Sequence, residues 1–208
     1  IIINLTLTLL FTVYLGKIYY PAQMEDKTNQ AAVEERWEWK GQPVGRLFKQ
    51  GFGQQQALLA VDPAGSLPYF SDLPAIDMLG LNDYYITHHP PKDIGEGWLG
   101  HELGDGAYVL SRRPDIVLFY LTEGKHDPFY LSGIQMVNDP IFTKNYTFTQ
   151  FLTSPLPGEY HQDSVTISAW LYRYSPRIGI KQNDSNIKIP AYFINDNSST
   201  YVHLDEER

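Results

Sequence analysis

The residues best suited to ligand chemistry are three aspartates that follow expected strands. Asp62, Asp77 and Asp83 each lie at or just beyond the end of a short apolar run. In open α/β sheets, ligands bind in the crevice at the carboxyl ends of the strands, and carboxylates there accept hydrogen bonds from sugar hydroxyls. Turn and helix-cap roles are the competing interpretation, which suits Asp62 before Pro63 and Asp83 before a short helix.

A group of histidines and carboxylates raises the question of a metal site. His88, His89, His101, Glu102 and Asp105 are residue types that bind metal ions. The adjacent histidines would point apart on a strand, and the His-Glu pair lacks the second histidine of zinc proteases. The sequence therefore predicts neither a metal nor a cofactor.

The chain also lacks the common motifs of nucleophilic catalysis. It has no cysteine, which excludes a thiolate nucleophile and Cys-ligated zinc. It has no Gly-x-Ser-x-Gly elbow, and Gly104-Asp-Gly106 lacks the lysine of a phosphate-binding loop. We therefore predict no catalytic residue.

The composition of the chain limits the classes of partner that it could bind. The net charge of −8 argues against nucleic acid, whose phosphates require a basic face, and against a polybasic contact with anionic lipid. Aromatic residues make up 14% of the chain, with 15 Tyr and 4 Trp. Such rings suit both stacking on sugars and packing in a core.

The elements that would position these residues form an α/β pattern. Continuous apolar runs predict buried strands at 57–62, 75–78 and 115–121, with short helices from Asp83 and over 106–113. This order predicts a Rossmann-like parallel sheet flanked by helices. A helix is expected over 25–50, broken at Gly41 and Pro43 and ended by glycines.

The C-terminal third changes character. Alternating, β-branched and aromatic residues predict additional antiparallel strands there, separated by turns. The expected strands are 147–152, 165–174 and 187–194, and the polar tail from Asn195 has room for one more at 201–204.

The first residues suggest a membrane. No charge occurs before Lys17, and Tyr19 and Tyr20 follow it, which is typical of a membrane interface. Sixteen uncharged residues fall short of the roughly 20 that span a bilayer. We expect residues 1–20 to be the remnant of a transmembrane helix and 21–208 a single extracytoplasmic domain. A half-buried strand, from the alternation of Ile3 to Leu9, and a cleaved signal stay open.

Four segments carry a resemblance to a known family. They read Asp62-Pro-Ala-Gly-Ser-Leu-Pro-Tyr-Phe-Ser71, Pro74-Ala-Ile-Asp-Met-Leu-Gly-Leu-Asn-Asp83, Gly100-His-Glu-Leu-Gly-Asp-Gly106 and Tyr108-Val-Leu-Ser-Arg-Arg-Pro-Asp115. This pattern resembles the C-terminal extracytoplasmic domain of bacterial GT-C type membrane glycosyltransferases, in particular arabinofuranosyltransferase-like proteins that use a polyprenyl-phosphate sugar. The likeness covers about residues 55–120.

The resemblance implies a role for this chain. In such transferases a multi-helix membrane region precedes the soluble domain and carries the catalytic carboxylate in an external loop. The chain alone would then be inactive and would bind or position the acceptor glycan on the periplasmic side of a bacterial inner membrane. The polar residues within the matched segments are the candidate glycan contacts: Tyr69, Asp77, Asn82, Asp83, His101 and Asp105.

Two other functions stay open. A non-catalytic assembly domain without a sugar site would show a flat apolar patch, whereas a sugar site would show exposed Tyr or Trp beside carboxylates. A stand-alone hydrolase would place a Ser or Asp within hydrogen-bond reach of a His.

Overall fold

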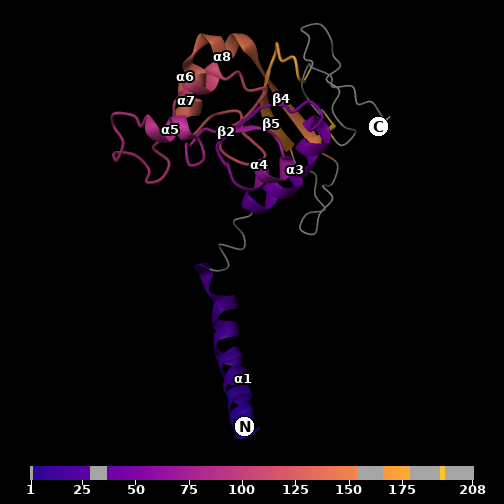
Figure 1. The fold of residues 1–208 in the computed structure, drawn as a ribbon, viewed down its shortest axis with the longest axis vertical. Coiled ribbons are helices and arrows are strands. Elements are labelled where there is room, and N and C mark those ends of the chain that lie inside the picture. The colour runs from indigo at the N-terminus through magenta and orange to yellow at the C-terminus, as the bar shows by residue number, and fades with distance from the viewer. Residues whose placement is uncertain (1, 29–36, 154–165, 179–192, 195–208) are drawn as a thin grey trace. The chain divides into compact units, whose positions relative to one another are not determined.

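The structure, a computed structural model, describes residues 2–28, 37–153, 166–178 and 193–194 (Figure 1). The chain divides into two compact units, residues 1–36 and residues 37–208.

In the first unit, most of the described residues belong to helix α1 (Ile2–Glu25). The strand that the alternation of Ile3 to Leu9 left open is therefore wrong. Polar threonines fit the helix because their hydroxyls donate to carbonyl oxygens one turn back, Thr8 to Asn4 and Thr12 to Thr8, at 2.9 Å each. Within the residues described, no helix combines the length and apolar character needed to cross a bilayer.

The second unit combines helices with one sheet. Its helices are α3 (Trp37–Phe52), α4 (Ser66–Ser71), α5 (Tyr84–His88), α6 (Gly106–Ser111), α7 (Leu131–Asn138) and α8 (Pro140–Asn145). Its strands are β1 (Leu59–Val61), β2 (Ala75–Asp77), β3 (Ile116–Leu118), β4 (Tyr146–Thr153), β5 (Thr166–Tyr172) and β6 (Phe193–Ile194).

The strands form one mixed sheet in the order β2-β1-β3-β5-β4-β6. Strands β2, β1 and β3 are parallel, and β5, β4 and β6 continue the sheet in antiparallel fashion. Val61 is level with Asp77 and with Leu118, so the carboxyl ends of the parallel strands meet at one edge. The predicted α/β class, with a Rossmann-like parallel part and added antiparallel strands, is confirmed.

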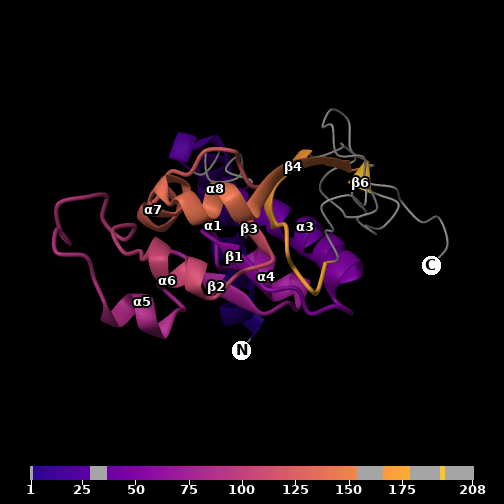
Figure 2. The ribbon, with the colours of Figure 1, turned by 90° about the horizontal axis from the view of Figure 1, so that it is seen from above.

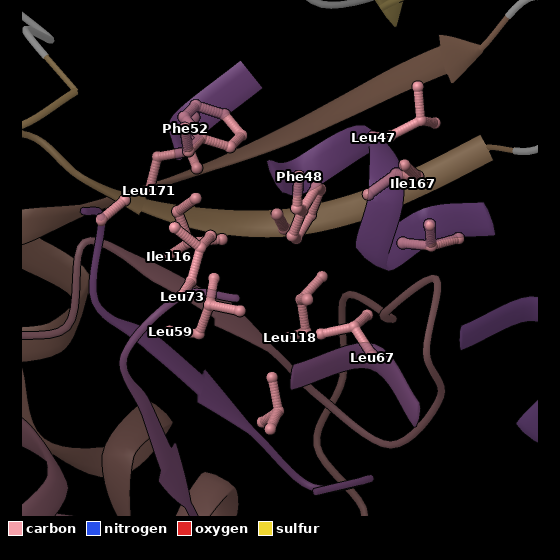
Figure 3. Close-up of a cluster of buried hydrophobic side chains, with 14 of the residues drawn as sticks. Leu47, Phe48, Phe52, Leu59, Leu67, Leu73, Ile116, Leu118, Ile167 and Leu171 are labelled. Carbon is pink, nitrogen blue, oxygen red and sulfur yellow. The ribbon is translucent and has the colours of Figure 1, made fainter. Parts of the chain in front are cut away.

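Helices cover both faces of the sheet (Figure 2). Leu59 and Val61 of β1 belong to the core beneath α3 and α4, whereas Ala60 between them packs on the other face, with residues of α5 to α8. This alternation is the period of two that a strand imposes on its side chains. Figure 3 shows Phe48 and Leu47 of α3 in the first core, facing the strands of the sheet.

Helix α3 differs from the expectation because it continues through Gly41 and Pro43. Gly41 and Gly45 serve packing rather than breaking the helix, whereas the helix ends at Phe52 just before Gly53, as expected. A Cβ on Gly41 would overlap the Ser66 hydroxyl, and one on Gly45 would lie 2.7 Å from the Leu67 carbonyl oxygen. The two glycines let the backbone of α4 approach α3 closely.

A buried carboxylate joins the amino ends of the strands. Asp115, which is fully buried, accepts hydrogen bonds from the Leu58 amide at 2.7 Å, the Ser175 hydroxyl, and the Arg177 guanidinium at 2.9 Å. Because both oxygens are occupied, this aspartate ties β1, β3 and the segment after β5 together.

Three short helices were not expected from the sequence. Residues 66–71 form α4, and α7 and α8 follow the loop after β3. Strands β4 and β5 match the expectation, while of the third predicted strand only 193–194 is described. The expected strand at 201–204 and the polar tail lie outside the described residues.

Candidate functional site

Asp62 lies at the carboxyl edge of the parallel strands, directly after β1. It is only 2% exposed. Its Oδ2 accepts a hydrogen bond of 2.7 Å from the amide of Tyr120, which follows β3. Its Oδ1 is buried and has no hydrogen-bond partner among the described residues. The side chain therefore links two strands through one oxygen, and its other oxygen is buried without a partner.

Burial makes the ionised form of the Asp62 carboxyl group energetically unfavourable. Burial raises the pKa of Asp62 to about 7, against an opposing effect of the Tyr120 amide, and the charge of Asp77 raises this pKa further. Near neutral pH the carboxyl group is therefore close to the midpoint of its titration.

Asp77 lies on the neighbouring strand and has a different role. Its Oδ1 accepts from the amides of Leu79 at 2.9 Å and Gly80 at 3.2 Å, and its Oδ2 accepts from the Asn82 amide at 2.7 Å. Burial raises the pKa of Asp77, and these amides act in the opposite direction. Asp77 thus holds the loop after β2 in place.

Five rings form a contiguous group, which we call the aromatic cluster: Trp98, His101, Tyr120, Phe129 and Tyr130. His101 stacks on Trp98 with centroids 4.5 Å apart and on Tyr130 at 5.1 Å. Tyr120 contacts Phe129 at 5.1 Å and Tyr130 at 5.9 Å. Trp98 and Phe129 remain 59% and 55% exposed. The cluster joins the loop before α6 to the loop after β3.

The aromatic cluster adjoins Asp62. Tyr120 belongs to the cluster and donates its amide to Asp62. Burial raises the pKa of Tyr130, and the negative charges of Asp62 and Tyr120 raise it further. Tyr120 also has a φ of +70°, a conformation that non-glycine residues rarely adopt. Strained residues of this kind concentrate at functional sites.

The structure distributes the sequence-predicted candidates over several roles. His101 lies in the aromatic cluster. Asp83 caps α5 through the Ile86 amide at 3.0 Å, and its other oxygen accepts from the Tyr108 hydroxyl at 3.2 Å. Asp105 caps α6 through the Tyr108 amide at 2.8 Å. The cap at Asp83 matches the alternative given above, whereas the cap at Asp105 was not expected from the sequence.

Two candidates lie elsewhere on the surface. Asn82 is exposed in the loop held by Asp77, to which its own amide donates. Tyr69 is exposed on α4, where its ring contacts Phe70 edge-on.

The adjacent histidines, His88 and His89, each stack on a tyrosine one helical turn earlier. His88 stacks on Tyr84 and His89 on Tyr85, each with ring centroids 4.0 Å apart. Their Nδ1 atoms lie 2.7 and 2.8 Å from the carbonyl oxygens of the same tyrosines. Across the described ranges, no three His, Asp or Glu side chains are grouped to hold a metal ion.

Sequence reasoning missed most of this site. Asp62 was put forward as a candidate acceptor at a strand end, with a turn role as the alternative, and His101 was a candidate contact. Trp98, Tyr120, Phe129 and Tyr130 were not singled out. Two signals were present: Trp98 and His101 are three residues apart in a glycine-rich loop, and Phe129-Tyr130 follows the clearest strand. Their convergence on Asp62 depends on strand order.

These features define an α/β domain in which parallel strands bring a buried carboxylate and exposed rings to their carboxyl edge. The chain belongs to the family described as Domain of unknown function (DUF8728), whose model matches residues 26–178. No curated protein and no solved structure matches the chain.

Proposed function

We propose that this domain binds carbohydrate at the carboxyl edge of its parallel strands. In this proposal it is the extracytoplasmic part of a bacterial membrane glycosyltransferase and positions the acceptor glycan. The observation that carries the proposal is the aromatic cluster beside Asp62, whose second oxygen has no partner.

The chemistry of a sugar ring matches this pair of features. One face of a sugar presents C–H groups that pack on aromatic rings, and its hydroxyls need hydrogen-bond partners once they leave water. Trp98 and Phe129 offer exposed ring surface for the apolar face, next to the buried carboxyl group of Asp62.

Positioning, rather than catalysis, is the proposed contribution of this chain. Glycosyl transfer needs a base for the acceptor hydroxyl and a means of holding it in place. The resemblance of residues 55–120 to transferase domains supports a parent protein whose membrane region supplies the catalytic carboxylate. The exposed apolar side chains of α1, among them Leu9, Leu10 and Phe11, support attachment to a membrane.

Calorimetric titration of the full chain with methyl glycosides and short oligosaccharides tests this function. Because α1 exposes apolar side chains, the titration is done in detergent. That detergent must lack a sugar headgroup, which would compete with the ligand. We expect Trp98→Ala to weaken binding about tenfold, since it removes the most exposed indole face of the cluster.

Tyr84→Ala is the matched control. Tyr84 is 79% exposed on α5, outside the cluster, so its removal should leave the affinity unchanged. Absence of binding at millimolar ligand, or equal losses in both variants, would contradict carbohydrate binding at the cluster.

One observation favours a second function, an assembly surface. Leu99 is 87% exposed and Ile94 48% exposed in the loop that carries Trp98. An assembly domain predicts that Leu99→Ser changes the sedimentation coefficient of the protein, whereas a sugar-binding domain predicts that it does not.

A further inference from the structure

We propose that the turn at Tyr120 is a pH-sensitive switch of the aromatic cluster, closed while Asp62 is protonated and released when Asp62 ionises. This inference concerns a movement of the protein itself and goes beyond carbohydrate binding. Asp62 acts in it as a buried positioning residue, without contact to a ligand.

The backbone turn at Tyr120 is strained. The Leu121 amide donates to the Phe119 carbonyl oxygen at 2.9 Å, which closes a three-residue turn with Tyr120 at its centre. The φ of +70° at Tyr120 is that of the γ-turn with positive φ, a rare and strained form. A residue other than glycine keeps such a conformation only where its surroundings hold it.

The neutral form of Asp62 holds this turn closed. Its Oδ2 accepts a hydrogen bond from the Tyr120 amide at 2.7 Å, across the 58 positions that separate the two residues. Because Oδ2 must remain an acceptor, the proton of the neutral carboxyl group lies on Oδ1, the oxygen without a partner. The protonated group therefore fits its buried place without a charge.

The ionised form of Asp62 fits the same place poorly. Oδ1 then carries negative charge while it is buried and lacks a hydrogen-bond partner. The titratable groups that interact electrostatically with Asp62 are Asp77 at the end of β2 and Tyr130 before α7, and both are acidic. Of the ion pairs that the described residues form, none involves Asp62. Ionisation therefore favours a conformation in which water reaches the carboxylate.

The Tyr120 turn is the part of these surroundings that can yield. Strands β1 and β3 beneath it are buried throughout, whereas Tyr120 is partly exposed. Beyond the turn, the Ser168 amide donates to the Glu123 carbonyl oxygen at 2.7 Å, and the Trp170 indole donates to the His126 carbonyl oxygen at 3.0 Å. These bonds tie the following segment to β5, so the release is confined to the turn.

Release of the turn changes the aromatic cluster by one ring. The Tyr120 ring leaves Phe129 and Tyr130, whose centroids lie 5.1 and 5.9 Å from it. Both of these rings keep their contacts with Trp98, at 5.8 and 6.2 Å. A sugar site at the cluster should therefore bind more tightly at pH 5 than at pH 8.

Amide hydrogen exchange of the full chain, followed by NMR between pH 5 and pH 8, tests the switch. Each rate is divided by the intrinsic rate of a free amide at the same pH. The closed turn holds the pKa of Asp62 at about 7, whereas the open turn lets it fall toward 3.8. The protection of the Tyr120 amide should therefore decrease as pH rises, by up to about 100-fold.

The Ser168 amide on β5 serves as the internal reference. It should be better protected than the Tyr120 amide at every pH, because a local release leaves β5 in place. Equal protection of the two amides would mean that exchange requires global unfolding, and it would overturn the switch. This comparison uses the wild-type protein and does not depend on the folding of a variant.

Asp62→Asn tests the assignment to this carboxyl group. Its carboxamide cannot ionise, and its carbonyl oxygen still accepts from the Tyr120 amide, so the protection of Tyr120 should no longer depend on pH. Asp127→Asn is the matched control, since Asp127 is an exposed carboxylate in the same segment, and it should keep the wild-type decrease. A decrease that persists in Asp62→Asn would contradict the proposal.

The switch and the proposed function fail separately. No sugar is present in the exchange experiment, so a negative result leaves carbohydrate binding standing. A lack of glycoside binding at millimolar concentration likewise leaves the switch standing.

Discussion

Asp62 and Asp77 follow or end adjacent parallel strands, yet only one of them is satisfied by the fold. Both oxygens of Asp77 accept hydrogen bonds from backbone amides of the next loop, whereas Asp62 accepts one hydrogen bond, from the Tyr120 amide. The contrast separates a residue that maintains the edge from a residue whose burial leaves one oxygen without a partner. Two consequences for stability follow from it.

The first consequence is that the stability of the protein depends on pH. Folding raises the pKa of Asp62 from 3.8 to about 7, so the folded protein keeps this proton over a range in which the unfolded chain loses it. The free energy of unfolding should therefore fall as pH rises from about 4 to about 7, by up to about 4 kcal/mol from this group.

Urea unfolding of Asp62→Asn at pH 5 and pH 8 measures this effect. The variant should show a smaller decrease between the two pH values than the wild type, and it should be the more stable protein at pH 8. Equal decreases in both proteins would show that folding does not raise the pKa of Asp62.

The second concerns the loop after β2. Asp77→Ala leaves the amides of Leu79, Gly80 and Asn82 without their acceptor, so we expect a loss of about 2–3 kcal/mol in urea unfolding. Asp93→Ala, at an exposed loop position, should change stability by less than about 0.5 kcal/mol. Similar values for the two variants would rule out an anchoring role for Asp77.

Among the elements, the contact between α3 and α4 decides how the sequence near Gly41 should be interpreted. Glycine followed by Pro43 predicted a broken helix, because both residues disfavour helical interiors. The structure keeps the helix, since the glycines face α4, where a side chain would collide with Ser66 or Leu67. Packing between elements outweighs local propensity here.

Gly45→Ala tests that packing, because the sign of the change in stability shows whether helix propensity or the steric clash dominates. Alanine is favoured over glycine within a helix by about 1 kcal/mol, but here its Cβ would lie 2.7 Å from the Leu67 carbonyl oxygen. We expect a net destabilisation of about 1–3 kcal/mol in thermal or urea unfolding. Gly16→Ala in α1, where no atom lies within 4 Å of the added Cβ, should not destabilise. Stabilisation by Gly45→Ala would contradict the close approach.

At the scale of the whole molecule, the sequence predicted the sheet better than the site. Buried strands such as β3 are continuous apolar runs that stand out in the sequence. Helices α4 and α8, of six residues each, are too short to show a period, although Asp139-Pro140 marks the start of α8 by a cap, with the Ile141 amide at 2.8 Å. Short elements therefore escape detection even where their caps are visible.

The site itself depends on contacts that no local pattern records. Asp62 and Tyr120 are 58 positions apart, and their hydrogen bond exists because β1 and β3 are neighbours in the sheet. Trp98 and Tyr130 meet through loops from different parts of the chain. The caps at Asp83 and Asp105 could be predicted because each acts within its own helix.

The most direct test of the account is an amide NMR titration of the full chain with the methyl glycosides. We predict saturable shifts confined to the carboxyl edge and the aromatic cluster, including Asp62, Trp98, Tyr120 and Tyr130, with α8 unaffected. Shifts that map to the exposed faces of α5 or α8 instead, or no shifts at millimolar ligand, would contradict the claim that this edge binds carbohydrate.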